Sequence, residues 1–148
     1  MVQLPDVVAG QRTATIVLPT AYSALSRLSE WVQAIARANR LSDVCAFRLE
    51  LVLVETVTNV IEHGGNSDPN ASIVVQVTCD AGRIVVQSED TGRPFDPTLV
   101  APPRKPESLD DAPIGGLGIV LMRSYTQAWE YERFEQKNRL RMTIACDG

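Results

Sequence analysis

The amino-acid sequence predicts one domain of the α/β class, because helical and strand-like patterns alternate along its 148 residues. Apolar residues recur at helical spacing from Ala21 to Arg40, and they occupy nearly every face of a helix from Val44 to Glu62. Short β-branched runs lie on either side of these helices. A chain of this length is the size of one ordinary domain, so residues 1–148 are expected to share one core.

The first half of the chain is predicted to form a strand followed by two helices. Thr13 to Leu18 is β-branched and apolar, which indicates the strand. Ser42 is a favourable N-cap for the second helix. That helix is apolar on so many faces that we expect it to be central and buried. Gly64 and Gly65 end it, and a turn-rich loop follows.

The second half is predicted to contain four strands and one short helix. Ala71 to Thr78 and Arg83 to Ser88 are strand-like, and the short link between them predicts an antiparallel hairpin. A short helix is expected from Leu117 to Tyr125. The closing strands are expected at Ala128 to Phe134 and Leu140 to Ala145.

A long segment without periodicity, from Arg93 to Pro113, separates the hairpin from the last helix. Six of the nine prolines lie in it. Long irregular loops inside small domains are uncommon and are often functional, so this segment is a candidate for a binding loop.

The composition argues against several classes of protein. The net charge is -4 and the isoelectric point is about 5.0, so no long-range positive field attracts nucleic acid or an anionic membrane. No stretch approaches the roughly 18 apolar residues of a membrane span, and residues 1–10 lack the pattern of a signal peptide. Cys45, Cys79 and Cys146 form no CxxC motif or Cys/His cluster, so we expect reduced thiols and a cytoplasmic location.

One polar stripe runs along the otherwise apolar second helix. At 100° per residue, Arg48, Glu55, Asn59 and Glu62 fall within a narrow wedge. Such a stripe can be a solvent-facing edge. However, Asn59 is a poor helix former in mid-helix and lies one turn after a carboxylate. A carboxylate and an amide oxygen at this spacing can serve a hard cation and a reacting hydroxyl group.

Two further motifs combine glycine with polar or backbone groups. Asp90-Thr91-Gly92 follows a strand, where an aspartate can accept a hydrogen bond from an exocyclic amine and glycine lets the backbone approach a flat ring. A plain turn is the alternative. Gly115-Gly116-Leu117-Gly118 opens into a helix, whose N-terminus favours an anion. The spacing matches neither a P-loop nor a dinucleotide fingerprint.

In this order, the three features resemble the N, G1 and G2 boxes of the histidine-kinase-like ATPase superfamily. The resemblance covers roughly Phe47 to Met122, and Leu53 to Gly64 is a near match to the N box of the small anti-sigma factor serine kinases. It implies a Bergerat-type ATP-binding fold. In this two-layer α+β sandwich, helices pack on one face of a mixed, mainly antiparallel sheet.

The resemblance also implies a role for each motif residue. Asn59 matches the Mg²⁺ ligand, and Glu55 matches the carboxylate that activates the attacking hydroxyl group or water. Asp90 matches the residue that reads the adenine amino group. Gly92 matches the glycine that packs against the adenine.

Gly116 and Gly118 match the glycines that pack on the phosphates of ATP, so the segment from about 93 to 115 becomes the ATP lid. Arg104 and Lys105 lie in this lid and are candidates to reach a γ-phosphate, although a solvated role is the alternative. Relatives commonly carry a Gly-Thr pair before the final strand. Here the chain has Asn138, which is a candidate substitute. His63 is interpreted as a packing residue rather than a catalytic one.

The resemblance implies an ATP-binding anti-sigma factor that is also a serine kinase, with an anti-sigma factor antagonist as phosphoacceptor and a sigma factor as second partner. A non-catalytic module that binds ATP and a protein is the alternative, as is a detached histidine-kinase catalytic domain. The sequence leaves the oligomeric state open, a homodimer included.

Overall fold

A computed structural model of the chain describes residues 6–8, 11–65, 68, 70–80, 82–100 and 117–146. The elements in chain order are β1 (Asp6–Val8), β2 (Gln11–Pro19), α1 (Ala24–Ala38), α2 (Asp43–His63), β3 (Ser72–Asp80), β4 (Arg83–Asp90), a 3₁₀ helix (Pro97–Leu99), α3 (Leu117–Tyr125), β5 (Thr126–Phe134) and β6 (Lys137–Ile144). β1 and the 3₁₀ helix were not expected from the sequence. The limits of α3 agree with the prediction.

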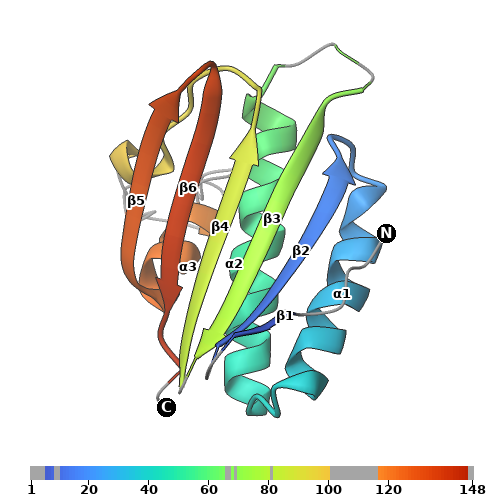
Figure 1. The fold of residues 1–148 in the computed structure, drawn as a ribbon. Coiled ribbons are helices and arrows are strands. Elements are labelled where there is room, and N and C mark those ends of the chain that lie inside the picture. Colours follow the sequence, from blue (N-terminus) through green and yellow to red (C-terminus); the bar gives the residue numbers. More distant parts are fainter. Residues whose placement is uncertain are drawn as a thin grey trace, which may run out of the picture.

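The described strands form one six-stranded sheet in the order β1-β2-β3-β4-β6-β5. Figure 1 shows the helices gathered on one face of this sheet, so the predicted two-layer fold is confirmed. Every described pairing is antiparallel rather than mixed. Two helices connect β2 to β3, and they return the chain to the end of the sheet from which an antiparallel neighbour must start.

The central helix α2 begins and is buried as its sequence predicts. The Ser42 side chain accepts a hydrogen bond of 3.1 Å from the amide of Cys45, which is the expected N-cap. Leu49, Leu53 and Val57 are fully buried in the core between the sheet and the other helices. No helix in the described part of the chain combines the length and the apolar character that a membrane crossing requires.

The buried face of the sheet changes from apolar to polar at one end. Alternate residues of β4 and β6 face the helices, and most of them are aliphatic. Near the end of β4 they become Ser88 and Asp90, and at the start of β6 the buried residue is Asn138. Since Asp90 and Asn138 are direct partners in the β4–β6 register, the sheet places two buried polar side chains side by side.

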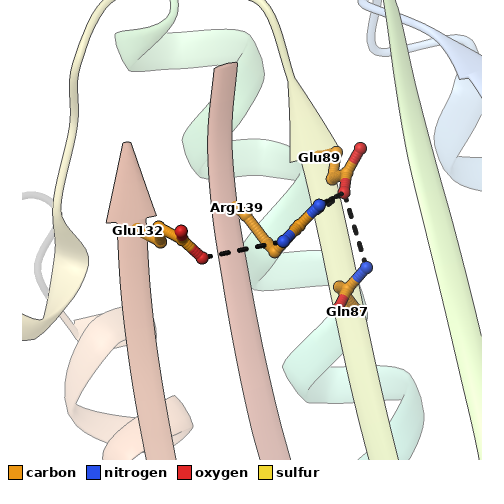
Figure 2. Close-up of polar contacts among 4 residues, drawn as sticks. All are labelled: Gln87, Glu89, Glu132 and Arg139. Atoms are coloured by element: carbon orange, nitrogen blue, oxygen red, sulfur yellow. Dashed lines mark hydrogen bonds and ion pairs between the residues drawn. The ribbon is translucent and has the colours of Figure 1, made fainter. Parts of the chain in front are cut away.

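The opposite face of the sheet carries a charged network across three strands. Figure 2 shows Arg139 on β6 between Glu89 on β4 and Glu132 on β5. The Arg139 guanidinium lies 2.7 Å from Glu89 and 3.6 Å from Glu132, and Gln87 donates to the same Glu89 oxygen at 3.5 Å. This network ties β4, β5 and β6 together beside the polar end of the core.

Tight turns join β3 to β4 and β5 to β6. Gly82 has a φ of 81°, which suits glycine in the predicted β3–β4 hairpin. Glu135 and Gln136 both have positive φ in the two-residue turn between β5 and β6, although neither is glycine. Residues other than glycine rarely adopt positive φ, so this turn has a local conformational cost and its sequence does not favour it.

The cysteines correct the expectation of reduced thiols. Cys45 in the first turn of α2 forms a disulfide with Cys146, which lies just beyond β6. The two residues are 101 positions apart, so only the fold brings them together and their spacing gave no sign of it. The remaining thiol, Cys79, is buried, and burial raises its pKa to about 11.

The core position Leu53 on α2 gives a direct test of this packing. Replacing this side chain, which is 0% exposed, with alanine should lower the free energy of unfolding by about 2 to 5 kcal/mol because a cavity is left behind. Leu99→Ala is the matched control, since Leu99 is 81% exposed, and it should change stability by less than about 0.5 kcal/mol. Urea denaturation measures both, and equal losses would contradict the assigned core.

Candidate functional site

A pocket lies where the C-terminal half of α2 faces the end of β4 and the start of β6. It brings together two residues predicted from separate motifs, Asn59 and Asp90. The lining is Thr56, Asn59, Val60, Gly64, Ser88, Asp90, Arg93, Phe95, Pro97, Tyr131, Asn138 and Leu140. Five of these side chains are apolar or aromatic, and six are polar or charged and converge from α2, β4, the segment after β4, and β6. The pocket therefore combines apolar contact surface with convergent hydrogen-bonding groups, as small-molecule sites do.

Asp90 is fixed at the inner end of this pocket. It is 8% exposed, and its Oδ1 accepts hydrogen bonds from the amide of Gly92 at 2.9 Å and from Asn138 Nδ2 at 3.0 Å. A buried carboxylate oriented in this way can accept a hydrogen bond from an amine donor in the pocket. The alternative prediction of a turn at Asp90-Thr91-Gly92 is also correct, because the hydrogen bond from the Gly92 amide to Asp90 Oδ1 closes an Asx turn.

Gly92 is required by the close approach of two backbone segments. A Cβ at this position would lie 2.8 Å from the Cα of Gly64 and 2.9 Å from Asp90 Oδ1. The amide of Arg93 donates to the Gly64 carbonyl at 2.8 Å. The segment after β4 is therefore fastened to the end of α2, so that the aspartate and the helix face the same pocket.

Asn59 lies half-buried on α2 and is suited to hold a cation. Its Nδ2 donates to the Met122 sulfur at 3.7 Å, which leaves the amide oxygen available. No group of three or more His, Cys, Asp or Glu side chains within the described ranges could hold a metal ion by itself. Asn59 therefore fits one ligand of a hard cation whose other ligands are phosphate oxygens and water.

Glu55 lies one turn before Asn59, and its carboxylate packs against the first turn of α3. A Cβ on Gly118 would overlap this carboxylate, so Gly118 gives Glu55 its space. Burial raises the pKa of Glu55, and the neighbouring Glu62 carboxylate raises it further. A carboxylate with a raised pKa is better matched to accepting a proton near neutral pH than an ordinary glutamate.

Asn59 is the one residue of the polar stripe in the pocket lining, which does not include Glu55, Arg48 or Glu62. Arg48 donates to the Ala145 carbonyl at 2.8 Å and lies over the Tyr125 ring, so it holds the chain end against α2. Glu62 is exposed and accepts a hydrogen bond from Tyr22 at 3.3 Å. Arg48 and Glu62 therefore have structural partners at the two ends of the stripe, on either side of Glu55 and Asn59.

His63 and the lid residues can be placed only in part. The His63 ring stacks on Phe95 with the ring centroids 4.3 Å apart, which agrees with a packing role. Phe95 in turn lines the pocket. Gly116, Arg104 and Lys105 lie outside the described residues.

Sequence reasoning missed several pocket residues. Phe95 and Pro97 follow the Asp-Thr-Gly motif, and Tyr131 lies on β5. An aromatic residue and a proline directly after a binding motif are a usable signal. Tyr131 carried none, because its position depends on the register of β5 with β6.

Comparisons with known proteins agree with this geometry. Residues 18–144 match the family described as the histidine kinase-like ATPase domain. The chain is 30% identical over 132 residues to the serine/threonine-protein kinase BtrW of Bordetella bronchiseptica, and the match covers 89% of this chain and 93% of that protein.

The fold is also found in a solved structure of low sequence similarity. The crystal structure of the RsbU and RsbW domains of a Mycobacterium tuberculosis protein aligns with a TM-score of 0.64 and 14% identity. The alignment covers 89% of this chain but only 31% of that one, so this chain corresponds to about a third of it. The family match spans α1, α2, α3, the pocket and most of the sheet, and the chain belongs to the histidine kinase-like ATPase family.

Proposed function

We propose that this chain is an ATP-dependent serine kinase that phosphorylates an anti-sigma factor antagonist and also sequesters a sigma factor. The observation that carries the kinase assignment is the placement of Glu55 and Asn59 one turn apart on α2, with Glu55 against the start of α3. The similarity to a serine/threonine-protein kinase over most of both chains supports it. The sigma factor and its antagonist are inferred from the resemblance to anti-sigma factor kinases, and a cytoplasmic location is part of the same proposal.

In this proposal, Asp90 and Asn59 bind different parts of the nucleotide complex. The Asp90 carboxylate accepts a hydrogen bond from the adenine amino group, while apolar and aromatic side chains of the pocket cover the ring. Asn59 is the side chain placed to hold Mg²⁺. When bound, the ion supplies charge neutralisation for the phosphates.

Phosphate transfer requires a proton acceptor beside the acceptor serine. The serine oxygen bonds to the γ-phosphorus while the bond from that phosphorus to the β,γ-bridging oxygen breaks, so ADP leaves and phosphoserine remains. The serine proton passes to the Glu55 carboxylate. Positioning and electrostatics supply most of the acceleration in such a reaction, so the rigid attachment of Glu55 and Asn59 to one buried helix is useful.

A non-catalytic module that binds ATP and a partner protein is the second candidate. In that case Glu55 would have no chemical role. The raised pKa of its half-buried carboxylate favours the kinase, because partly desolvating a carboxylate without a function costs stability.

Substitution of Asn59 tests the cation site. Asn59→Ala and Asn59→Asp should abolish or strongly weaken Mg²⁺-dependent ATP binding, because the amide oxygen is lost or replaced by a charged group. Isothermal titration calorimetry with and without Mg²⁺ measures this. Asn39→Ala, at the end of α1, is the control and should bind ATP normally. Unchanged metal-dependent affinity in both Asn59 variants would refute the ligand assignment.

Substitution of Glu55 separates the two candidate functions. Glu55→Gln should retain ATP and partner binding but lower the rate of transfer by about 10² to 10⁴, because glutamine cannot accept the serine proton. Transfer from labelled ATP to a phosphorylatable antagonist measures the rate. Glu50→Gln is the control on the same helix, where the carboxylate accepts a hydrogen bond from Ser29. A wild-type rate in Glu55→Gln would make Glu55 structural, and no transfer by any form would favour the binding module.

The pH dependence of transfer tests the environment of Glu55. Because its pKa is raised, the base loses its proton at a higher pH than an ordinary glutamate does, and the rate should rise with pH as it does so. Glu62→Gln removes a neighbouring negative charge and lowers the pKa of Glu55, so the rising limb should move to lower pH. A pH profile of kcat in both proteins measures the shift, and a limb that moves to higher pH would contradict the assignment.

A further inference from the structure

We propose that Asn138 is a positioning residue that determines base specificity by fixing the rotamer of Asp90, and that it does so without being the residue that reads the base. The inference rests on the proposed binding of ATP with its adenine at Asp90. It differs from a simple replacement of the family's Gly-Thr pair, since the side chain of Asn138 is committed to protein partners.

The donor end of Asn138 faces three acceptors. Nδ2 lies 3.0 Å from Asp90 Oδ1, 3.4 Å from the Gly92 carbonyl and 2.8 Å from the Arg93 carbonyl. The residue is only 6% exposed, so these contacts are made away from bulk water. The two protons of this amide are thus shared between the carboxylate and the backbone that follows β4.

The acceptor end of Asn138 faces two donors. Its Oδ1 accepts from the amide of Phe95 at 3.4 Å and from the hydroxyl of Tyr131. Because acceptors surround one end of the amide and donors surround the other, a flipped Asn138 would lose both sets of hydrogen bonds. The orientation of this side chain is therefore determined by its surroundings.

Asp90 takes up its orientation from Asn138 and from its own turn. Oδ1 accepts from both the Gly92 amide and Asn138, which leaves Oδ2 as the acceptor for a ligand in the pocket. An amine on the base can donate to Oδ2, whereas a carbonyl oxygen at the same place would face a carboxylate and be rejected. Freeing Oδ1 would let the carboxylate rotate and weaken this discrimination.

The same side chain also fixes the beginning of the segment after β4. Asn138 contacts Gly92, Arg93 and Phe95 in turn, and Arg133 adds a hydrogen bond of 2.7 Å to the Gly92 carbonyl. The side-chain amide of Asn138 therefore links base recognition by Asp90 to the position of the segment after β4.

The test compares ATP with inosine triphosphate, in which a carbonyl oxygen replaces the adenine amino group. Titration calorimetry gives the affinity ratio of the two nucleotides for wild type, Asn138→Leu and Asp90→Asn. The ratio should fall about tenfold in Asn138→Leu, since a hydrogen bond to a charged group is lost. Asp90→Asn should also lose the preference for ATP.

Two further variants serve as a control and as a replacement for Asn138→Leu. Arg139→Leu changes the next residue of β6, whose side chain lies on the opposite face (Figure 2), and should leave the ratio unchanged even if stability falls. If Asn138→Leu does not fold, Tyr131→Phe removes a donor to Asn138 and should lower the ratio in the same direction by a smaller factor.

The outcomes separate this proposal from the proposed function. Equal weakening of both nucleotides in Asn138→Leu, with the wild-type ratio retained, would overturn the positioning role while ATP binding stands. A wild-type protein that binds both nucleotides equally would overturn base reading by Asp90 and this inference with it. Failure of the wild type to bind either nucleotide would overturn the proposed function itself.

Discussion

The burial of α2 is the constraint on which the rest of the structure depends. This helix packs against the sheet on one side and lies beside α1 and α3, so most of its surface has to be apolar (Figure 1). Burying each leucine or valine side chain contributes about 1.5 to 3 kcal/mol, so the helix cannot rotate without losing several such contributions. Its polar stripe is consequently held at a defined angle, with Glu55 and Asn59 beside α3. The core thus determines where these candidate site residues lie.

Gly92 and Gly118 lie in the predicted binding motifs, and the packing of the protein itself requires glycine at both positions, whether or not a ligand is bound. Gly92 allows the segment after β4 to lie against Gly64 at the end of α2, and Gly118 leaves space for the Glu55 carboxylate. Each of these two predicted nucleotide-binding motifs is therefore also a point of close packing within the protein. The two requirements are compatible, because a backbone that approaches another backbone closely can also approach a flat ring or a phosphate.

Local patterns predicted most of the fold and part of the site. α2, α3 and the β3–β4 hairpin follow from periodicity, capping and a short link, and each was expected from the sequence. The disulfide and the network around Asn138 were not, because they join residues that are far apart in the chain and depend on strand register. Glu55, Asn59 and Asp90 could be singled out as candidate site residues because each is a polar group in an otherwise apolar or turn-forming context, and the structure brings Asn59 and Asp90 into one pocket. Tyr131 could not, since nothing in its neighbourhood distinguishes it from an ordinary strand residue.

Adjacent residues of β6 point to opposite faces of the sheet and take part in different networks. Arg139 faces the outer side of the sheet and joins Glu89 to Glu132, whereas Asn138 faces inward and joins Asp90 to the segment after β4. Because side chains alternate along a strand, the register that places Arg139 beside Glu89 also places Asn138 beside Asp90. A register shift by one residue would exchange the two faces and place a guanidinium beside Asp90 in the pocket. The outer salt bridges are partly exposed and contribute only about 1 kcal/mol or less each, so the buried side chains of Leu140, Met142 and Ile144 are the stronger determinant of the register that forms the pocket.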